Sequence, residues 1–292
     1  MEKLTIFTPT YNRAYCLHRC YESLCRQTTK DFIWMIIDDG SEDNTNLLVS
    51  DWITENKIKI KYLYQPNQGM HGAHNTAYEN ISTELNVCLD SDDFFTDSAV
   101  ETILTFWKNE SSEKVSGIVC LNENLKGDVI GTRLPAIKAA TLYNLYHKHK
   151  VRGDKKLIYR SELTKQFRYP LFHNERYVGL DYKYLKIDEK FPLLILNQVV
   201  CCVDYQLDGS SHNMFHQYRR NPRGFAFYRK ELMQLSYATV TFKFRQAVHF
   251  VSSSLLMKNK KFLKETPEKI LTIAALPAGM LLTSYIKFKT TK

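Results

Sequence analysis

Three carboxylates stand close together in the segment Asp90-Ser91-Asp92-Asp93, directly after the apolar run Val87-Cys88-Leu89. Acidic side chains at the end of a buried strand repel one another and lose hydration, so they need a cation or several hydrogen-bond donors nearby. Mg²⁺ and Mn²⁺ commonly bind one or two carboxylates together with the phosphates of a substrate. The segment therefore predicts a site for a divalent metal and a nucleotide-type substrate.

Three further polar clusters also follow apolar runs. They are Thr8-Pro9-Thr10-Tyr11-Asn12-Arg13, Asp38-Asp39-Gly40-Ser41-Glu42-Asp43, and Gln65-Pro66-Asn67-Gln68-Gly69 with its continuation to Asn75. In parallel α/β sheets, ligands bind beside the carboxyl ends of the strands. We therefore expect all four clusters to meet at one edge of a sheet.

The elements that would position these clusters alternate between strand and helix. Apolar runs predict strands over residues 4–8, 32–37, 58–64 and 84–89, and helical spacing predicts helices over 14–27, 44–56 and 68–79. This alternation is typical of an α/β fold with a largely parallel sheet. Further along we expect helices over 99–108 and 177–187, strands over 117–122, 128–131, 157–159 and 193–204, and mostly helical segments over 225–250 and 258–289.

Positive charge is concentrated at the end of the chain. The 292 residues carry a formal net charge of +9, but residues 205–292 alone hold 15 Lys and Arg against 4 Asp and Glu, a charge of +11. A basic segment of this kind favours an anionic partner such as lipid headgroups, phosphates or nucleic acid. The apolar stretch over 270–286 contains Pro277 and is flanked by lysines, so we expect an interfacial or shallowly inserted helix rather than a full membrane span. A buried C-terminal helix is the alternative.

The cysteines and the beginning of the chain indicate a cytoplasmic protein. There are seven cysteines and no C-x-x-C pair, which is typical of reduced, buried thiols rather than of disulfides or a zinc site. The chain enters a strand within its first few residues, without the apolar region of a signal peptide.

In order and spacing, the four clusters resemble the motifs of the family 2 glycosyltransferases. The resemblance is dense over residues 3–100 and weaker over 152–230. It implies the GT-A fold, with a Rossmann-like nucleotide-sugar domain, and transfer of a sugar with inversion from a nucleotide diphosphate donor, usually a UDP-sugar. It also implies a divalent Mn²⁺ or Mg²⁺ and a glycan or lipid-linked glycan acceptor, as in cell-surface polysaccharide synthesis.

From the resemblance and the charge pattern we expect two domains. Residues 1–205 would form the GT-A catalytic domain, with a nucleotide-binding half over 1–100 and an acceptor half over 101–205. Residues 206–292 would form a basic helical extension that associates peripherally with the inner face of the cell membrane and does not bind nucleic acid.

The resemblance also assigns roles to individual residues. Asp92 is the implied metal ligand, Asp90 would contact either the ribose or the metal, and Asp93 either joins them as a ligand or caps the next helix. Tyr11 would stack on the nucleobase unless it covers the core, and Asp39 would accept a hydrogen bond from the ring N–H of the base. Asp38 would be a turn residue or a helix cap, and Asp43 would belong to the start of the following helix. The implied nucleotide-sugar contacts are Thr8, Pro9, Tyr11, Arg13, Asp39, Asn67, Gly69, Asn75, Asp90 and Ser91.

An inverting transfer needs a general base on the face of the sugar opposite the leaving group. The family's E-D pair matches Leu180-Asp181, so Asp181 is the expected base although Leu180 replaces the first acid. The alternatives are Glu175, then Asp188, or a helix N-cap role for Asp181 itself. His74 stands where the family commonly has arginine, which weakens the expected diphosphate contact there. Secondary candidates for sugar, acceptor or diphosphate contacts are Asp154, Arg160 and His212.

Two other function classes fit parts of the sequence. A nucleotidyltransferase that makes an activated sugar would share the fold, but the glycine-rich start expected after its first strand is absent. A non-catalytic basic protein that binds a membrane or nucleic acid would explain only the charge, and no helix-turn-helix or zinc-finger pattern accompanies it.

Overall fold

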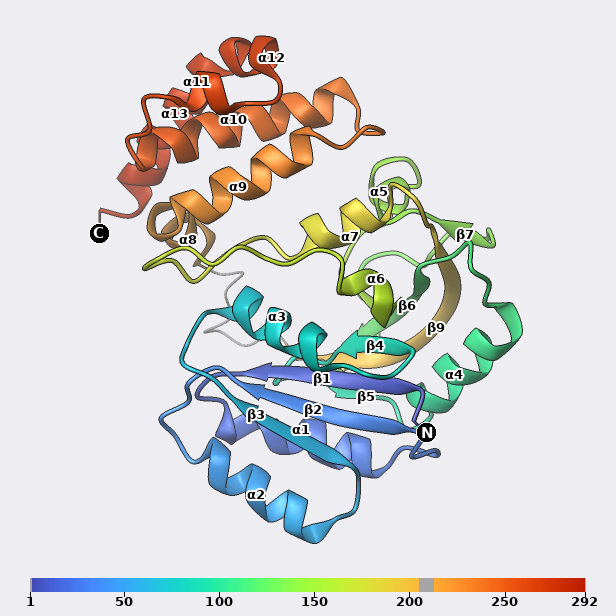
Figure 1. Ribbon diagram of the computed structural model, residues 1–292. Helices are drawn as coiled ribbons and strands as arrows, with labels where there is room; N and C mark the ends of the chain where they lie inside the picture. The colour runs from blue at the N-terminus through green and yellow to red at the C-terminus, as the bar shows by residue number, and fades with distance from the viewer. Residues whose placement is uncertain (1, 205–212, 292) are drawn as a thin grey trace. The chain divides into compact units, whose positions relative to one another are not determined.

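The computed structural model describes residues 2–204 and 213–291, so His212 lies outside the described part. The chain divides into two compact units. The first, the sheet unit, comprises Met1–Arg168 and Lys190–Gln206; the second, the helical unit, comprises Tyr169–Glu189 and Leu207–Lys292. The sheet unit has the mixed α/β architecture that the alternating pattern predicts (Figure 1).

Four adjacent parallel strands carry the polar clusters. In the order β3-β2-β1-β4, they are β3 (Ile60–Tyr64), β2 (Phe32–Asp38), β1 (Leu4–Thr10) and β4 (Leu85–Cys88). The register pairs Thr10 with Asp38 and Phe7 with Cys88, so the strands end at the same edge. Strand β1 runs two residues past its expected end at Thr8. Pro9 is tolerated because the pairing with β4 stops at Phe7, so the missing N–H interrupts no ladder.

The remaining strands extend this sheet beyond β4. Strand β8 (Lys155–Arg160) lies antiparallel between β4 and β6 (Gly117–Asn124), and β9 (Leu193–Val203) lies parallel to β6. Short strands β5 (Phe94–Phe95) and β7 (Ala139–Ala140) pair antiparallel with β9. The prediction of a mostly parallel sheet is confirmed. The strand expected over 128–131 is wrong, because only an isolated bridge between Glu123 and Val129 forms there.

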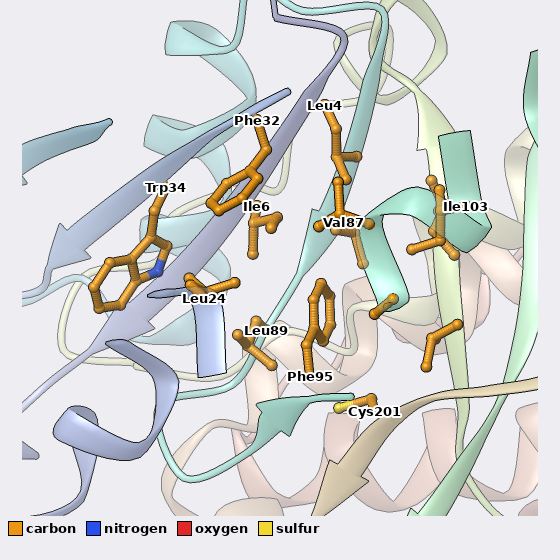
Figure 2. Close-up of a cluster of buried hydrophobic side chains, with 14 of the residues drawn as sticks. Leu4, Ile6, Leu24, Phe32, Trp34, Val87, Leu89, Phe95, Ile103 and Cys201 are labelled. Atoms are coloured by element: carbon orange, nitrogen blue, oxygen red, sulfur yellow. The ribbon is translucent and has the colours of Figure 1, made fainter. Parts of the chain in front are cut away.

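Helices cover both faces of the sheet. Helices α1 (Ala14–Cys25), α2 (Thr45–Glu55) and α4 (Ala99–Glu110) pack on the face that bears Ile6, while α3 (Met70–Asn80) packs on the face that bears Phe7. Two short helices, α5 (Leu142–His147) and α6 (Ser161–Thr164), follow later in the unit. Figure 2 shows the core between sheet and helices, in which Trp34 and Leu24 lie beside Phe32 and Leu89. Burial of these large apolar side chains stabilises the edge on which the polar loops stand.

The helical unit contains α7 (Asp181–Ile187), α8 (Met214–Arg220), α9 (Pro222–Met233), α10 (Val240–Leu256), α11 (Phe262–Glu265), α12 (Lys269–Ala274) and α13 (Leu276–Lys289). The helix expected over 177–187 begins later, at Asp181, and the segment over 225–250 is two helices. The break falls before Thr239, whose hydroxyl caps α10 by accepting a hydrogen bond from the Phe242 N–H. Among the described residues, no helix is long and apolar enough to cross a membrane.

The boundary between the units differs from the expected division at residue 205. Residues 169–189, which the sequence assigns to the acceptor half of the catalytic domain, pack with the C-terminal helices instead. The reason is close local packing: a Cβ at Gly224 would lie 2.0 Å from the carbonyl oxygen of Tyr177, so only glycine fits. The functional roles given to the two halves and to the extension remain predictions.

Candidate functional site

The loops after β2 and β3 are joined by the carboxylate of Asp39. Its Oδ1 accepts hydrogen bonds from the Gln68 N–H (2.9 Å) and from Gln65 Nε2 (2.6 Å), and its Oδ2 accepts one from the Gly69 N–H (2.8 Å). Gly40, at φ +88°, lies so near that an added Cβ would be 2.9 Å from the Asn67 nitrogen. Asp39, Asn67 and Gly69 are thus brought together as the motif order predicts, with Asp39 also holding the loop in place.

The loops after β1 and β2 are also tied together. Asn12 adopts a left-handed conformation (φ +53°); its N–H donates to Ser41 Oγ, and its Oδ1 accepts from the Glu42 N–H at 2.8 Å. Asp43 Oδ2 accepts from the Ala14 N–H at the start of α1, and Oδ1 accepts from the Thr45 N–H at the start of α2. The interpretation of Asp43 as a helix-start residue is confirmed.

Asp38 is the turn residue that the alternative interpretation describes. Its Oδ1 accepts a hydrogen bond from the Ser41 N–H at 2.8 Å, and its Oδ2 accepts one from Tyr62 Oη at 2.6 Å. Asp38 is buried, and both of its oxygens are used inside the protein. Asp39 is therefore the member of this pair that reaches the neighbouring loop.

Residues of the first cluster divide between the core and the surface. The Thr8 hydroxyl is buried and accepts a hydrogen bond from Trp34 Nε1 at 2.9 Å, and Pro9 is buried beside it. Tyr11, in contrast, is 47% exposed, so its ring does not cover the core. Arg13 is half-buried, stacks its guanidinium near the Tyr15 ring and places its positive charge close to Asp92. Asn75 lies buried in α3.

The acidic motif begins directly after β4. Asp90 and Asp92 are half-buried, whereas Ser91 and Asp93 are buried. Loss of hydration, and then the negative charge of Asp90, raise the pKa of Asp92 above its ordinary value, while the charge of Arg13 opposes this rise. Two carboxylates that disfavour each other's charge in this way are stabilised when a cation lies between them.

Asp93 has a different environment. Its Oδ2 lies 3.6 Å from Nζ of Lys156 with both side chains buried, and its Oδ1 accepts a hydrogen bond from the Asp204 N–H. Burial raises the pKa of Asp93 to about 7, and the Lys156 charge opposes that shift. Asp204 in turn pairs with Arg19 of α1 at 2.5 Å. Asp93 thus anchors the motif to the end of β9, a role different from both the metal contact and the helix cap considered from the sequence.

The acidic motif fits a divalent cation shared with a substrate. Among the residues that the structure describes, no group of three or more His, Cys, Asp and Glu side chains forms a metal site. The protein would therefore supply Asp92 and Asp90, and the remaining ligands would come from phosphate oxygens and water, which is the arrangement that Mg²⁺ and Mn²⁺ favour.

Two residues that support the acidic motif, Lys156 and Cys88, were not predicted from the sequence. Lys156 also donates to the Cys88 carbonyl oxygen at 3.3 Å, and the Cys88 thiol lies 3.6 Å from Asp90 Oδ1. His74 Nε2 is 3.8 Å from the same sulfur, and its Nδ1 is 3.2 Å from Tyr78 Oη. His74 therefore lies inside the layer between α3 and the sheet. The lysine pair Lys155-Lys156, which directly precedes the apolar residues of β8, was the one signal that could have pointed to Lys156.

The secondary candidates Asp154 and Arg160 lie at opposite ends of β8. Asp154 immediately precedes this strand at the edge that carries the acidic motif. Arg160 pairs with Leu85 at the start of β4, which places it at the other edge of the sheet. It forms an ion pair with Glu162 at 3.0 Å. The expectation that Arg160 shapes the sugar or acceptor site is therefore wrong, because β8 runs antiparallel to its neighbour.

The expected base belongs to the helical unit. Asp181 is the first residue of α7, and Leu180 occupies the N-cap position, so the N-cap interpretation of Asp181 is wrong. Asp181 Oδ2 accepts a hydrogen bond from Tyr228 Oη at 2.7 Å. The residue is exposed, yet loss of hydration in its dense surroundings raises its pKa, while the bond from Tyr228 and the charge of Arg229 oppose this.

The alternative bases are less accessible. Glu175 accepts hydrogen bonds from the Arg223 N–H (3.0 Å) and the Gly224 N–H (2.8 Å), the first-turn donors of α9. Glu175 thus caps the N-terminus of α9 although it is distant in the sequence, and it takes the place of a side chain at the N-cap position. Asp188 is buried at the end of α7. Asp181 is thus the most exposed carboxylate of the three.

Comparisons with known proteins agree with this arrangement. The model of the family described as glycosyl transferase family 2 matches residues 5–168. The chain is 26% identical over 220 residues to the Escherichia coli UDP-Glc:alpha-D-GlcNAc-diphosphoundecaprenol beta-1,3-glucosyltransferase WfgD, covering 74% of this chain and 83% of that protein. It is 32% identical over 102 residues to the glycosyltransferase GlyA of Streptococcus pneumoniae, covering 35% of this chain but only 14% of that protein.

Solved structures show the same fold. The crystal structure of TarS 1–349 from S. aureus in complex with UDP-GlcNAc has a TM-score of 0.65 and 18% identity, covering 98% of this chain and 83% of that chain. The mannosyltransferase PcManGT from Pyrobaculum calidifontis, in complex with GDP-Man and Mn²⁺, has a TM-score of 0.57 and 16% identity, covering 98% and 88%. The chain has the GT-A fold and belongs to glycosyl transferase family 2.

Proposed function

We propose that this chain is a metal-dependent, inverting glycosyltransferase that transfers a sugar from a UDP-sugar to a lipid-linked glycan in cell-surface polysaccharide synthesis. The observation that carries the proposal is the meeting of four polar loops at one sheet edge, with half-buried Asp90 and Asp92 among them. The relatives support the reaction class: one is named for a UDP-glucose donor and a diphosphoundecaprenol-linked acceptor.

In this proposal the acidic motif holds the metal. Asp92 and Asp90 supply its protein ligands, and Asp93 is withheld by Lys156. When bound, the divalent cation would neutralise the diphosphate and stabilise it as a leaving group. Mn²⁺ accompanies the donor in the mannosyltransferase of the same fold, which supports the choice of Mn²⁺ or Mg²⁺.

The other three loops would bind the nucleotide. The exposed ring of Tyr11 offers a stacking face for the base, and Asp39 would accept the ring N–H of uracil in addition to its three loop donors. Arg13, beside Asp92, would contact a donor phosphate. The remaining residues of the predicted nucleotide-sugar site lie on the same loops and are Asn67, Gly69 and Ser91.

Asp181 is proposed as the base that accepts the proton of the acceptor hydroxyl. A raised pKa brings a carboxylate closer to neutral pH, where it is a stronger base when ionised. Tyr228 fixes the position of the carboxylate through its hydrogen bond. We expect Asp181→Asn to lower kcat by at least about 100-fold while leaving donor binding intact, whereas Tyr228→Phe should shift the acid limb of the pH–rate profile.

Peripheral association with the inner face of the membrane is part of the proposal. The acceptors named for the relatives WfgD and the Campylobacter jejuni GalNAc(5)-diNAcBac-PP-undecaprenol beta-1,3-glucosyltransferase are lipid-linked. A lipid-linked acceptor presents its sugar at the membrane surface, so an enzyme held there meets it readily. The +11 charge of residues 205–292 supports attraction to anionic lipids.

The test of the proposal is metal-dependent donor turnover. Purified protein is incubated with a panel of UDP- and GDP-sugars, with and without Mn²⁺, and release of the nucleoside diphosphate is measured. We expect turnover with one donor, loss of turnover on chelation, and a reduction of at least about 100-fold in Asp92→Asn. Asp51→Asn removes an exposed carboxylate on α2 and serves as the matched control. Full activity of Asp92→Asn, or release of pyrophosphate in place of the diphosphate, would overturn the proposal.

A further inference from the structure

Helices α12 and α13 present many of their apolar side chains outward. The exposed positions follow a helical spacing of three and four residues through both helices, and we call them the apolar stripe: Ile270, Ile273, Ala274, Pro277, Ala278, Leu281, Tyr285 and Phe288. Ile270 is 84% exposed, Leu281 73% and Phe288 71%. A helix of a soluble protein normally turns such residues toward the core.

The opposite face of the same helices is the buried one, and apart from Ile286 its side chains are small or polar. It contains Thr272, Gly279, Thr283 and Thr290. A Cβ at Gly279 would lie 2.4 Å from Val251 Cγ1 of α10, and the Thr283 hydroxyl is 3.1 Å from Ser252 Oγ. Close helix contact through small and hydroxyl-bearing residues is how helices pack where the surroundings are apolar. The inner face therefore explains the packing against α10. Within the helical unit the ring of Tyr285 contacts that of Phe215 in α8, whereas Ile270, Leu281 and Phe288 remain largely exposed.

Positive charge brackets the stripe. Residues 270–286 contain no charged side chain, Lys269 precedes them, and Lys287 and Lys289 follow. Residues 258–292 together hold eight lysines and two acidic residues, Glu265 and Glu268. An apolar face edged by lysines complements a lipid surface that carries anionic headgroups.

A second copy of the chain fits the stripe less well than lipid does. Two stripes packed face to face would bring lysines against lysines in either orientation, because both ends are basic. A membrane span is not the alternative, since none of the described helices is long and apolar enough to cross a bilayer. Pro277, in the first turn of α13, also lies at the junction of two separate helices.

We propose that the apolar stripe is the surface by which this protein docks on a bilayer containing anionic lipid, with α12 and α13 lying in the plane of the interface. Leu281 and Phe288 enter the acyl boundary, and Lys269, Lys287 and Lys289 contact headgroups. This deepens the proposed function, on which it rests for the lipid-linked acceptor, because the same surface would hold the enzyme where that acceptor lies.

The experiment is flotation of the full chain with vesicles. Binding is measured with phosphatidylglycerol–phosphatidylcholine vesicles and with phosphatidylcholine alone, at low and high salt. We expect the wild type to float with the anionic vesicles, and L281E/F288E to bind at least about tenfold less, because two apolar side chains no longer enter the bilayer. L281M/F288L keeps the stripe apolar and should bind like the wild type.

The matched control is V240E/F244E, which makes the same charge change at exposed apolar residues of α10 outside the stripe. The proposal is overturned if the wild type does not float, or if V240E/F244E loses as much binding as L281E/F288E. It is also overturned if sedimentation without lipid shows a dimer that L281E/F288E abolishes, because a second copy is then the occupant. Donor hydrolysis in lipid-free buffer separates the two proposals: vesicle binding without any donor turnover contradicts the proposed function alone.

Discussion

Nζ of Lys156 lies 3.6 Å from Oδ2 of Asp93, and both side chains are buried. The pair joins β8 to the loop that follows β4, and Asp93 is buried whereas Asp90 and Asp92 are half-buried. A buried charge that loses its partner is costly, whereas removal of both charges costs much less. Loss of either partner alone is therefore expected to destabilise the loop, because the other charge would then be buried without its partner.

The first prediction concerns this pair. Lys156→Met leaves Asp93 as an unpaired buried acid and should lower the free energy of unfolding of the sheet unit by about 3 kcal/mol. The double variant Lys156→Met with Asp93→Asn should recover much of the loss. Urea unfolding of the two single variants and the double variant measures the coupling. Additive losses would show that the two side chains do not interact.

The second prediction concerns Asp39 as a support of the β3 loop. Asp39→Ala leaves the Gln68 and Gly69 N–H groups without their acceptor, so stability should fall by about 3 kcal/mol. Amide hydrogen exchange of residues 65–69 in the donor-free protein should accelerate. Ser41→Ala, in the neighbouring turn, is the control. If exchange is unchanged while nucleotide affinity falls, Asp39 acts only on the base.

The third prediction concerns Cys88 and Asp90, a proposed metal ligand. The thiol at 3.6 Å from Oδ1 orients the carboxylate, so Cys88→Val should weaken Mn²⁺ affinity by about threefold, the expected effect of a weak hydrogen bond. Cys88→Ser restores a donor and should retain the wild-type affinity. Titration of Mn²⁺ by electron paramagnetic resonance measures the affinity directly. Equal losses in both variants would point to packing rather than to the hydrogen bond.

The fourth prediction concerns the start of α9. Glu175→Gln removes a negative charge from the first-turn N–H groups of Arg223 and Gly224 and should destabilise the helical unit by about 1 kcal/mol. Glu175→Ala removes both acceptors and should cost about 2 kcal/mol. Hydrogen exchange of the α9 amides measures the loss of stability in each of the two variants. A larger loss of sugar transfer than of stability would instead indicate that Glu175 takes part in the reaction.

The fifth prediction is a pH dependence in the helical unit. Burial, with the charges of Arg229 and Arg245, lowers the pKa of His249 to about 3. His249 is thus neutral in the folded protein and protonated in the unfolded chain below about pH 6.5, so stability is lost as the pH falls through this window toward 3. His249→Gln should lose less stability between pH 7 and pH 4, as measured by exchange of the α10 amides. If the wild type and His249→Gln lost equal stability between pH 7 and pH 4, His249 would be excluded as a cause of the acid destabilisation.

The sequence alone determined the order of the elements and the position of the polar loops. Apolar runs and helical spacing predict β1 to β4 and α1 to α4 within a few residues, because both signals come from neighbouring residues in the chain. The parallel alternation also predicts that the loops bearing Asp39 and Asp92 meet at one edge. Pairing that depends on distant residues was not predictable in this way, as the antiparallel course of β8 and the position of Arg160 show.

Tertiary structure decided what each carboxylate does. In the sequence, Asp90, Asp92 and Asp93 are equivalent neighbours. In the fold, Lys156, which lies on a strand more than sixty residues further along the chain, forms an ion pair with Asp93 alone among the three. Only the fold shows Asp181 beside Tyr228 and separates the buried small face of α13 from its apolar stripe. Charge pairing and burial arise from contacts between segments that are distant in the sequence. The local sequence pattern therefore determines which loops carry polar residues, whereas tertiary packing determines which of these residues are accessible to a ligand or a membrane.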